Sequence, residues 1–213
     1  MQLTSYFTVK GYGEQEIVIQ KSRFIAQVTR ASTEEEAQGF IKSIKKKYWD
    51  ASHNCFAYVI GEHSHIQKAN DDGEPGGTAG VPILEVIRKR DLKDTVVVVT
   101  RYFGGIKLGA GGLIRAYGRA AAEGIDAAGV VERKLMSIMS IEMDYPWLGK
   151  VENELGSSPY MAKETQYLEK VKMYVYVTSG EEARFNDWVA NLTNGQAEAR
   201  FAGEEYVEIS QRR

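Results

Sequence analysis

Four side chains in the first half of the chain have the chemistry for acid–base catalysis or metal binding. His53 precedes a short acidic segment in which Asp71, Asp72 and Glu74 stand beside glycine and proline. Carboxylates at this spacing on a glycine-containing loop can converge on a cation. Acidic residues beside glycine and proline are also ordinary turn formers, because their side chains bond to their own backbone. The spacing lacks the closing glutamate of an EF-hand. The sequence therefore favours a turn over a catalytic site built on His53, Asp72 and Glu74, or a metal site built on Asp71, Asp72 and Glu74.

A glycine-rich segment follows a run of β-branched residues further along the chain. Thr95 to Thr100 is typical of a buried strand, and five glycines lie between Gly104 and Gly112. A strand, a glycine loop and a helix N-terminus together expose backbone N–H groups that suit an anion. The same glycines also suit a tight chain reversal or close helix–sheet packing. Neither a dinucleotide fingerprint nor a P-loop is complete here, so the sequence predicts no nucleotide cofactor.

Basic and aromatic residues surround this glycine-rich segment. Cations that pair with phosphate, beside rings that stack on unpaired bases, are typical of RNA-binding surfaces. Tyr102 and Phe103 equally suit the core at a strand end, and Arg115 with Arg119 equally suits a solvated helix face. The predicted nucleic-acid or anion-binding residues are Arg101, Gly104, Gly105, Lys107, Gly109 and Arg115.

The charge of the chain is nearly balanced but unevenly spread. The 213 residues carry a formal net charge of −2 at pH 7. Residues 1–133 hold 18 Lys and Arg against 16 Asp and Glu, whereas residues 134–213 hold 9 against 13. A nucleic-acid-binding protein usually has a larger positive excess. Any RNA contact must therefore depend on a local basic patch.

The sequence contains one cysteine, Cys55, which excludes an internal disulfide and a CxxC metal pair. Its position in an apolar run predicts a buried thiol. No apolar run approaches membrane-spanning length, and the first residues lack the basic start and apolar stretch of a secretory signal. We expect a cytoplasmic protein with no membrane contact and no cofactor.

The hydrophobic pattern predicts the elements that position these residues. Strands are expected near residues 6–9, 16–19, 24–28, 54–60 and 66–69. A first helix begins after Ser32 or Thr33, where an acidic turn follows. A second helix is expected to be capped by Thr78 and to bury Val81, and a third to run from about residue 112 to 128. Residues 1–133 are thus predicted to form an α+β sandwich.

Residues 134–213 have a second pattern of their own. Strand, helix, strand, strand, helix and strand are predicted in that order at 136–143, 146–155, 161–167, 171–177, 181–192 and 197–209. This βαββαβ order builds a ferredoxin-like sandwich of one antiparallel sheet and two helices. The chain is therefore expected to form two α+β domains, residues 1–133 and 134–213.

Several motifs of the first domain resemble the IMPACT/YigZ family. They are the segment from Arg101 to Gly109, the acidic loop from Asp71 to Gly80, and residues 22–26 and 53–58. The resemblance covers the whole first domain, and the second domain is similar to that of the bacterial YigZ branch. It implies a fold like the second domain of ribosomal protein S5 for residues 1–133. Eukaryotic members carry a further N-terminal domain that binds a translation regulator. That domain has no counterpart in these residues, so we do not expect that partner.

The residues and the resemblance together favour a non-catalytic binding protein that contacts RNA or the translation machinery and regulates translation. Part of this hypothesis is a fold-level analogy with RNA-contacting ribosomal and elongation-factor domains, which locates no site. Two alternatives stay open. One is a metal-dependent hydrolase that uses the acidic loop from Asp71 to Glu74, and the other is a protein-interaction module.

Overall fold

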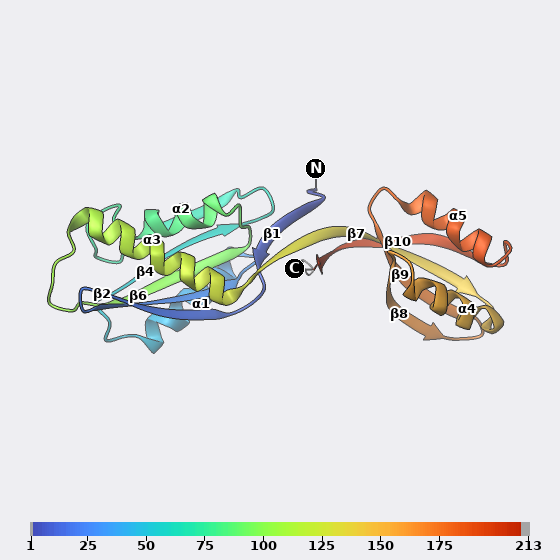
Figure 1. Cartoon of the computed structure of the whole chain (residues 1–213), viewed down its shortest axis with the longest axis horizontal. Helices are drawn as coiled ribbons and strands as arrows, with labels where there is room; N and C mark the ends of the chain where they lie inside the picture. Colours follow the sequence, from blue (N-terminus) through green and yellow to red (C-terminus); the bar gives the residue numbers. More distant parts are fainter. Residues whose placement is uncertain (1, 210–213) are drawn as a thin grey trace. The chain divides into compact units, whose positions relative to one another are not determined.

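A computed structural model describes residues 2–209 and contains two five-stranded sheets and five helices within that range (Figure 1). The chain divides into two compact units. Unit 1 runs to Arg133 and takes in Ile209, and unit 2 covers Lys134–Glu208. Each unit has a hydrophobic core of its own, in keeping with a two-domain α/β chain.

The sheet of unit 1 has the strand order β2-β3-β6-β4-β5, and every neighbouring pair is antiparallel. Its strands are β2 (Gly13–Ile19), β3 (Ser22–Arg30), β6 (Thr95–Tyr102), β4 (His53–Ile60) and β5 (Ile66–Asn70). Strand β6 is the middle strand, and it extends to Tyr102 where the sequence predicted an end at Thr100. This extension places Arg101 inside the sheet.

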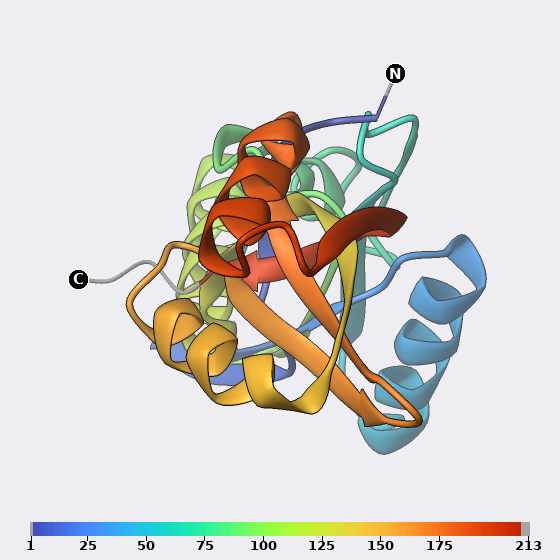
Figure 2. The same ribbon diagram turned by 90° about the vertical axis from the view of Figure 1, so that its right-hand side faces the viewer.

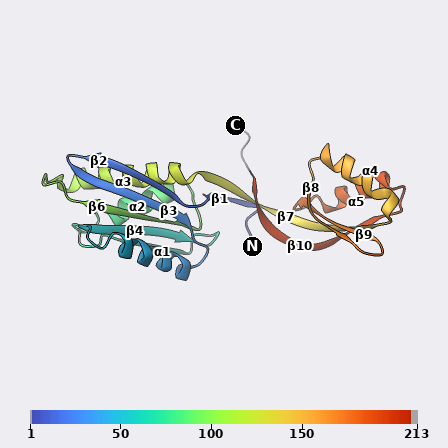
Figure 3. The same ribbon diagram turned by 90° about the horizontal axis from the view of Figure 1, so that it is seen from below.

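Helices cover both faces of this sheet (Figure 3). The first helix, α1 (Glu34–Lys47), lies on one face, while α2 (Gly80–Lys89) and α3 (Gly109–Ala128) lie on the other. Val97 and Val99 pack in the core shared with α2 and α3, whereas Val96 and Val98 pack in the core shared with α1. The unbroken valine run of β6 therefore reflects burial on both faces.

The start of α2 corrects two sequence expectations. Thr78 does not cap this helix, because its hydroxyl donates to the Pro75 carbonyl (2.6 Å). Instead, the Asp71 carboxylate accepts the N–H groups of Ala79 (3.0 Å) and Gly80 (2.8 Å) at the helix N-terminus. Val81 is 48% exposed, and the buried apolar side chains of α2 are Pro82, Ile83 and Ile87. A carboxylate from the preceding loop thus takes the place of a local side-chain cap.

Unit 2 follows the βαββαβ order that the sequence predicted. Its elements are β7 (Val130–Met143), α4 (Tyr145–Gly156), β8 (Met161–Tyr167), β9 (Val171–Thr178), α5 (Glu182–Leu192) and β10 (Glu198–Ile209). The strands are ordered β10-β7-β9-β8, and β1 (Ser5–Val9) is a further neighbour of β7 in the same sheet. Helices α4 and α5 pack on one face of the sheet, where Val151 and Phe185 join a single core (Figure 2).

The division between the units at Arg133 falls inside strand β7 and not in a loop. We expect residues 134–209, expressed alone, to fold cooperatively, because the core around Phe185 is complete within them. Urea unfolding followed by near-ultraviolet circular dichroism of Trp147 and Trp188 would test this. A broad transition without a native baseline would contradict independent folding of this part.

Candidate nucleic-acid interface

One end of the unit 1 sheet collects four connecting segments, and we call it the loop end. It consists of the turn at Gln20 and Lys21 and of loops 48–52, 71–79 and 103–108. The pairing of Arg23 with Tyr102 and of His53 with Arg101 brings together the start of β3, the end of β6 and the start of β4, and with them the turn at residues 20–21 and loops 103–108 and 48–52. The acidic and glycine-rich loops lie side by side, because residues of both line one pocket. Between them is a pocket of about 330 Å³ whose lining includes Glu74, Pro75, Arg101, Phe103 and Lys107.

Asp71 uses its carboxylate to hold the acidic loop and α2. Its two oxygens accept backbone N–H groups from Gly77 (2.8 Å), Ala79 and Gly80. Burial acts to raise the pKa of Asp71, but these three hydrogen bonds outweigh it and lower the pKa below its ordinary value. Both carboxylate oxygens of Asp71 therefore accept backbone hydrogen bonds.

Asp72 and Glu74 point to other partners. The Asp72 carboxylate pairs with Lys45 Nζ (2.6 Å) and accepts the Asn54 N–H (2.7 Å). The Glu74 carboxylate is turned inward, toward Arg101. Within residues 2–209, no group of three His, Cys, Asp or Glu side chains is arranged to hold a metal ion. The three candidate metal ligands thus bind three different partners within the protein: backbone N–H groups, Lys45 and Arg101.

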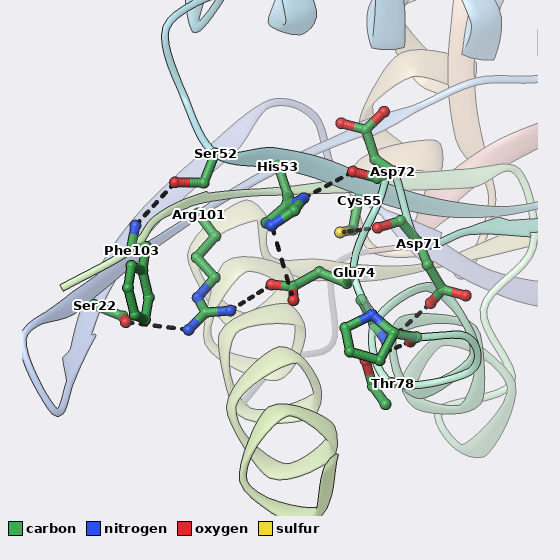
Figure 4. A network of polar contacts seen from close by, with 12 residues as sticks. Ser22, Ser52, His53, Cys55, Asp71, Asp72, Glu74, Thr78, Arg101 and Phe103 are labelled. Carbon is green, nitrogen blue, oxygen red and sulfur yellow. Dashed lines mark hydrogen bonds and ion pairs between the residues drawn. The ribbon is translucent and has the colours of Figure 1, made fainter. Parts of the chain in front are cut away.

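Glu74 and Arg101 form a buried ion pair beneath the pocket (Figure 4). Arg101 Nη1 donates to Glu74 Oε1 at 2.6 Å, and the two side chains are 6% and 4% exposed. The Tyr117 hydroxyl donates to the same carboxylate oxygen (2.8 Å), and Arg101 Nη2 donates to Ser22 Oγ (3.3 Å). Arg101 Nε is buried without a hydrogen-bond partner in the described part of the chain. Arg101 therefore organises the floor of the pocket and is not a free surface cation.

His53 and Cys55 complete this polar network (Figure 4). His53 Nδ1 lies 2.8 Å from the Asp72 carbonyl, which can only accept, so Nδ1 carries the proton. His53 Nε2 is 3.9 Å from Glu74 Oε2. The Cys55 thiol donates to the Asp71 carbonyl (3.0 Å), and burial is the main cause that raises its pKa to about 12. Cys55 is thus the buried thiol that the sequence predicted.

The glycines of the second loop have conformational roles. Gly105 and Gly109 adopt positive φ angles of 82° and 69°, which favour glycine over other residues. The Gly104 N–H donates to Ser22 Oγ (3.1 Å), and a Cβ at this position would lie 2.0 Å from the Lys21 carbonyl carbon. These three glycines let the loop turn close against the β2–β3 turn and enter α3.

The mouth of the pocket has the features of an anion-binding surface. Helix α3 begins at Gly109, and its N-cap Leu108 supplies no side-chain hydrogen bond, so first-turn N–H groups are available. Lys107 and Arg115 are exposed and have no ion pair with any residue in 2–209. The Arg115 guanidinium reaches the first turn of α3, 3.5 Å from the Cβ position of Gly111. Of the predicted residues, Lys107 and Gly109 therefore line the pocket together with the buried Arg101, and Arg115 lies beside the first turn of α3.

The sequence reasoning overlooked Trp49, which lies in loop 48–52 of the same end. Its side chain is 82% exposed. The loop is tied to the end of β6, because the Tyr102 hydroxyl donates to Asp50 (2.8 Å) and the Phe103 N–H donates to Ser52 Oγ (3.1 Å). A tryptophan two residues after the lysine run 45–47 was the available signal.

The fold and the loop end define a two-unit α/β protein with a candidate ligand pocket in its first unit. Residues 20–125 match the Impact N-terminal domain, and residues 141–196 match a second domain described as Domain of unknown function (DUF1949). The chain is 62% identical over 206 residues to the IMPACT family member YvyE of Bacillus subtilis (strain 168), covering 97% of this chain and 95% of that one. It is 31% identical over 179 residues to the IMPACT family member YigZ of Escherichia coli (strain K12), covering 83% and 88%. The chain belongs to the IMPACT family, as its motifs predicted.

A solved structure supports the fold across the chain. It is described as the crystal structure of an hypothetical protein, and it is 28% identical with a TM-score of 0.61, covering 95% of this chain and 99% of that one. In the part of the chain that the structure describes, no helix is both long enough and apolar enough to span a bilayer.

Proposed function

We propose that this IMPACT family protein is a non-catalytic binding protein that contacts RNA, or RNA within the translation machinery, through the loop end of unit 1. The observation that carries the proposal is the pocket between the acidic and glycine-rich loops. There, Lys107 and the half-exposed ring of Phe103 lie at the uncapped N-terminus of α3. The second unpaired cation, Arg115, lies outside the pocket lining, with its guanidinium beside the first turn of the same helix. Helix N-termini and basic side chains bind phosphate, and an exposed ring stacks on an unpaired base.

The local charge supports an anionic ligand despite the nearly neutral chain. The acidic side chains of the acidic loop already have partners within the protein. Asp71 accepts hydrogen bonds from backbone N–H groups, Asp72 forms an ion pair with Lys45, and Glu74 forms one with Arg101. Lys107 and Arg115 have none. The carboxylate of Asp50 in loop 48–52 accepts the neutral Tyr102 hydroxyl and has no ion pair within residues 2–209, so one free negative charge stands against these two free cations. The free charge of the loop end is therefore positive on balance, and RNA contact requires such a local basic patch.

We further propose that unit 1 has the fold of the second domain of ribosomal protein S5 and that unit 2 is a ferredoxin-like sandwich. The strand order β10-β7-β9-β8, with both helices on one face, supports the second assignment. We propose that the protein acts in the cytoplasm, regulates translation and uses no cofactor.

The double variant Lys107→Gln/Arg115→Gln tests the RNA contact. We expect it to weaken binding of single-stranded RNA and to reduce the slope of log K against log salt concentration by about 0.7 per lost phosphate contact, hence roughly 1.4 in total. Titration of labelled RNA at two or more salt concentrations measures both quantities. Arg101 stays unchanged in this variant, because its loss would disturb the buried pair with Glu74.

Lys10→Gln/Lys89→Gln is the matched control, since it removes two exposed cations away from the loop end and should leave the slope as in the wild type. An unchanged slope in Lys107→Gln/Arg115→Gln would mean that these side chains are not phosphate contacts. Failure of the wild type to bind RNA at low salt would overturn the proposed function itself.

A further inference from the structure

We infer that the loop end binds RNA as an unpaired strand, with one base stacked on Phe103 beside the pocket and another stacked on Trp49. The inference rests on the RNA-binding function proposed above. It adds the form of the ligand and a second contact residue in a different loop.

Trp49 has no evident role within the fold. Its side chain is 82% exposed, and it makes no hydrogen bond or ring contact with the other described residues. The two other tryptophans, Trp147 and Trp188, pack against the core of unit 2. An indole ring left in water forgoes the favourable burial of a large apolar surface. An exposed tryptophan on an ordered loop therefore points to an external partner.

Two hydrogen bonds hold the Trp49 loop against the segment that carries Phe103. The Tyr102 hydroxyl donates to Asp50, the neighbour of Trp49, and the Phe103 N–H donates to Ser52 Oγ. The Tyr102 ring is also covered by the Arg23 guanidinium, 5.2 Å from the ring centroid. Both exposed rings are thus presented by loops fixed to the same strand end.

The charges around the two rings favour a polyanion over a protein partner. Lys21 lies in the β2–β3 turn, where its backbone lies against Gly104, and Lys46 lies in the last turn of α1, three residues before Trp49. Both lysines are exposed, and within residues 2–209 neither has an ion pair.

Two further free cations lie on the other side of this end. Lys107 lines the same pocket as Phe103, and Arg115 lies beside the first turn of α3. The carboxylate of Asp50, next to Trp49, has only the neutral Tyr102 hydroxyl as a partner within residues 2–209, so the free cations outnumber it. Phosphates between stacked bases would pair with such cations.

The geometry also distinguishes unpaired from paired RNA. In a duplex the faces of the bases are stacked on one another, so they are not available to Phe103 or Trp49. We therefore expect the full chain to bind a single-stranded oligoribonucleotide at least tenfold more tightly than a duplex of equal length and composition.

Substitution of the two rings tests the stacking directly. Trp49→Ala and Phe103→Ala should each weaken binding of the single-stranded oligonucleotide roughly 5- to 100-fold, while the salt slope stays unchanged because no charge is removed. Trp49→Phe keeps an aromatic face and should recover most of the affinity. RNA binding should quench tryptophan fluorescence in the wild type and leave that of Trp49→Phe nearly unchanged.

Phe201→Ala is the control, since Phe201 is 60% exposed in unit 2 and should not affect binding. If the wild type binds RNA with the expected salt slope but Trp49→Ala binds within twofold of it, or if the duplex binds equally well, the stacking inference fails and the proposed function stands. If the wild type does not bind RNA, both fail, and a protein partner becomes the explanation for the exposed rings.

Discussion

Replacement of Arg101 by methionine is expected to lower the free energy of unfolding of unit 1 by about 3–5 kcal/mol, because Glu74 would be left buried without its charge partner. Both side chains are almost completely buried, and the guanidinium also packs over Phe24, 5.3 Å from the ring centroid. Urea titration of wild type and variant, followed by far-ultraviolet circular dichroism, measures the change.

The double variant Arg101→Met/Glu74→Leu separates the missing charge partner from a packing defect. It removes both charges, so most of the lost stability should return, although the Tyr117 hydroxyl then lacks its acceptor. A loss below 1 kcal/mol in Arg101→Met alone would mean that Glu74 takes up a proton or reaches water, and the pair would not organise the pocket floor as we describe.

Asp71→Ala should destabilise unit 1 by about 2 kcal/mol at neutral pH, because three backbone N–H groups at the start of α2 lose their acceptor. The effect depends on pH in a defined direction. The pKa of Asp71 in the folded protein lies below its ordinary value of 3.8. Its stabilising contribution is therefore complete above that value and disappears as the pH falls through the lower folded pKa.

Urea midpoints of wild type and Asp71→Ala at pH 7 and near pH 2.5 test this expectation. The two proteins should differ most at pH 7 and converge in acid. Asp71→Asn is the control, since it keeps an acceptor oxygen without the charge and should fall between them. A gap between wild type and Asp71→Ala that widens in acid would contradict the assigned role of this carboxylate.

The order and type of the elements could be predicted from the sequence, because periodicity and local capping are encoded within a few residues. Thr33 is an example, since its hydroxyl accepts the Glu36 N–H three residues later, as a local rule predicts. The same rule predicted that Thr78 caps α2, and this prediction was wrong. Asp71 lies eight residues before Ala79, and only the folded loop brings its carboxylate to the helix.

The candidate site was only partly predictable for the same reason. The glycine pattern placed Gly109 at a helix start, and Lys107 followed from its position in the loop. The partner of Arg101 is 27 residues away in sequence, and no periodic pattern encodes such a pair. The exposure of a tryptophan is also not predictable from its sequence neighbours alone. Trp49 follows the end of a helix and is exposed, whereas Trp188 faces the core of unit 2.

Cys55 gives the chain a natural label for following the opening of one unit. It is the single cysteine of the sequence, it is completely buried in unit 1, and its raised pKa keeps it in the unreactive thiol form at neutral pH. An alkylating reagent can therefore modify it only when unit 1 opens around β4. The rate of covalent labelling then reports the opening kinetics of unit 1 within the intact chain, and unit 2 contributes no signal.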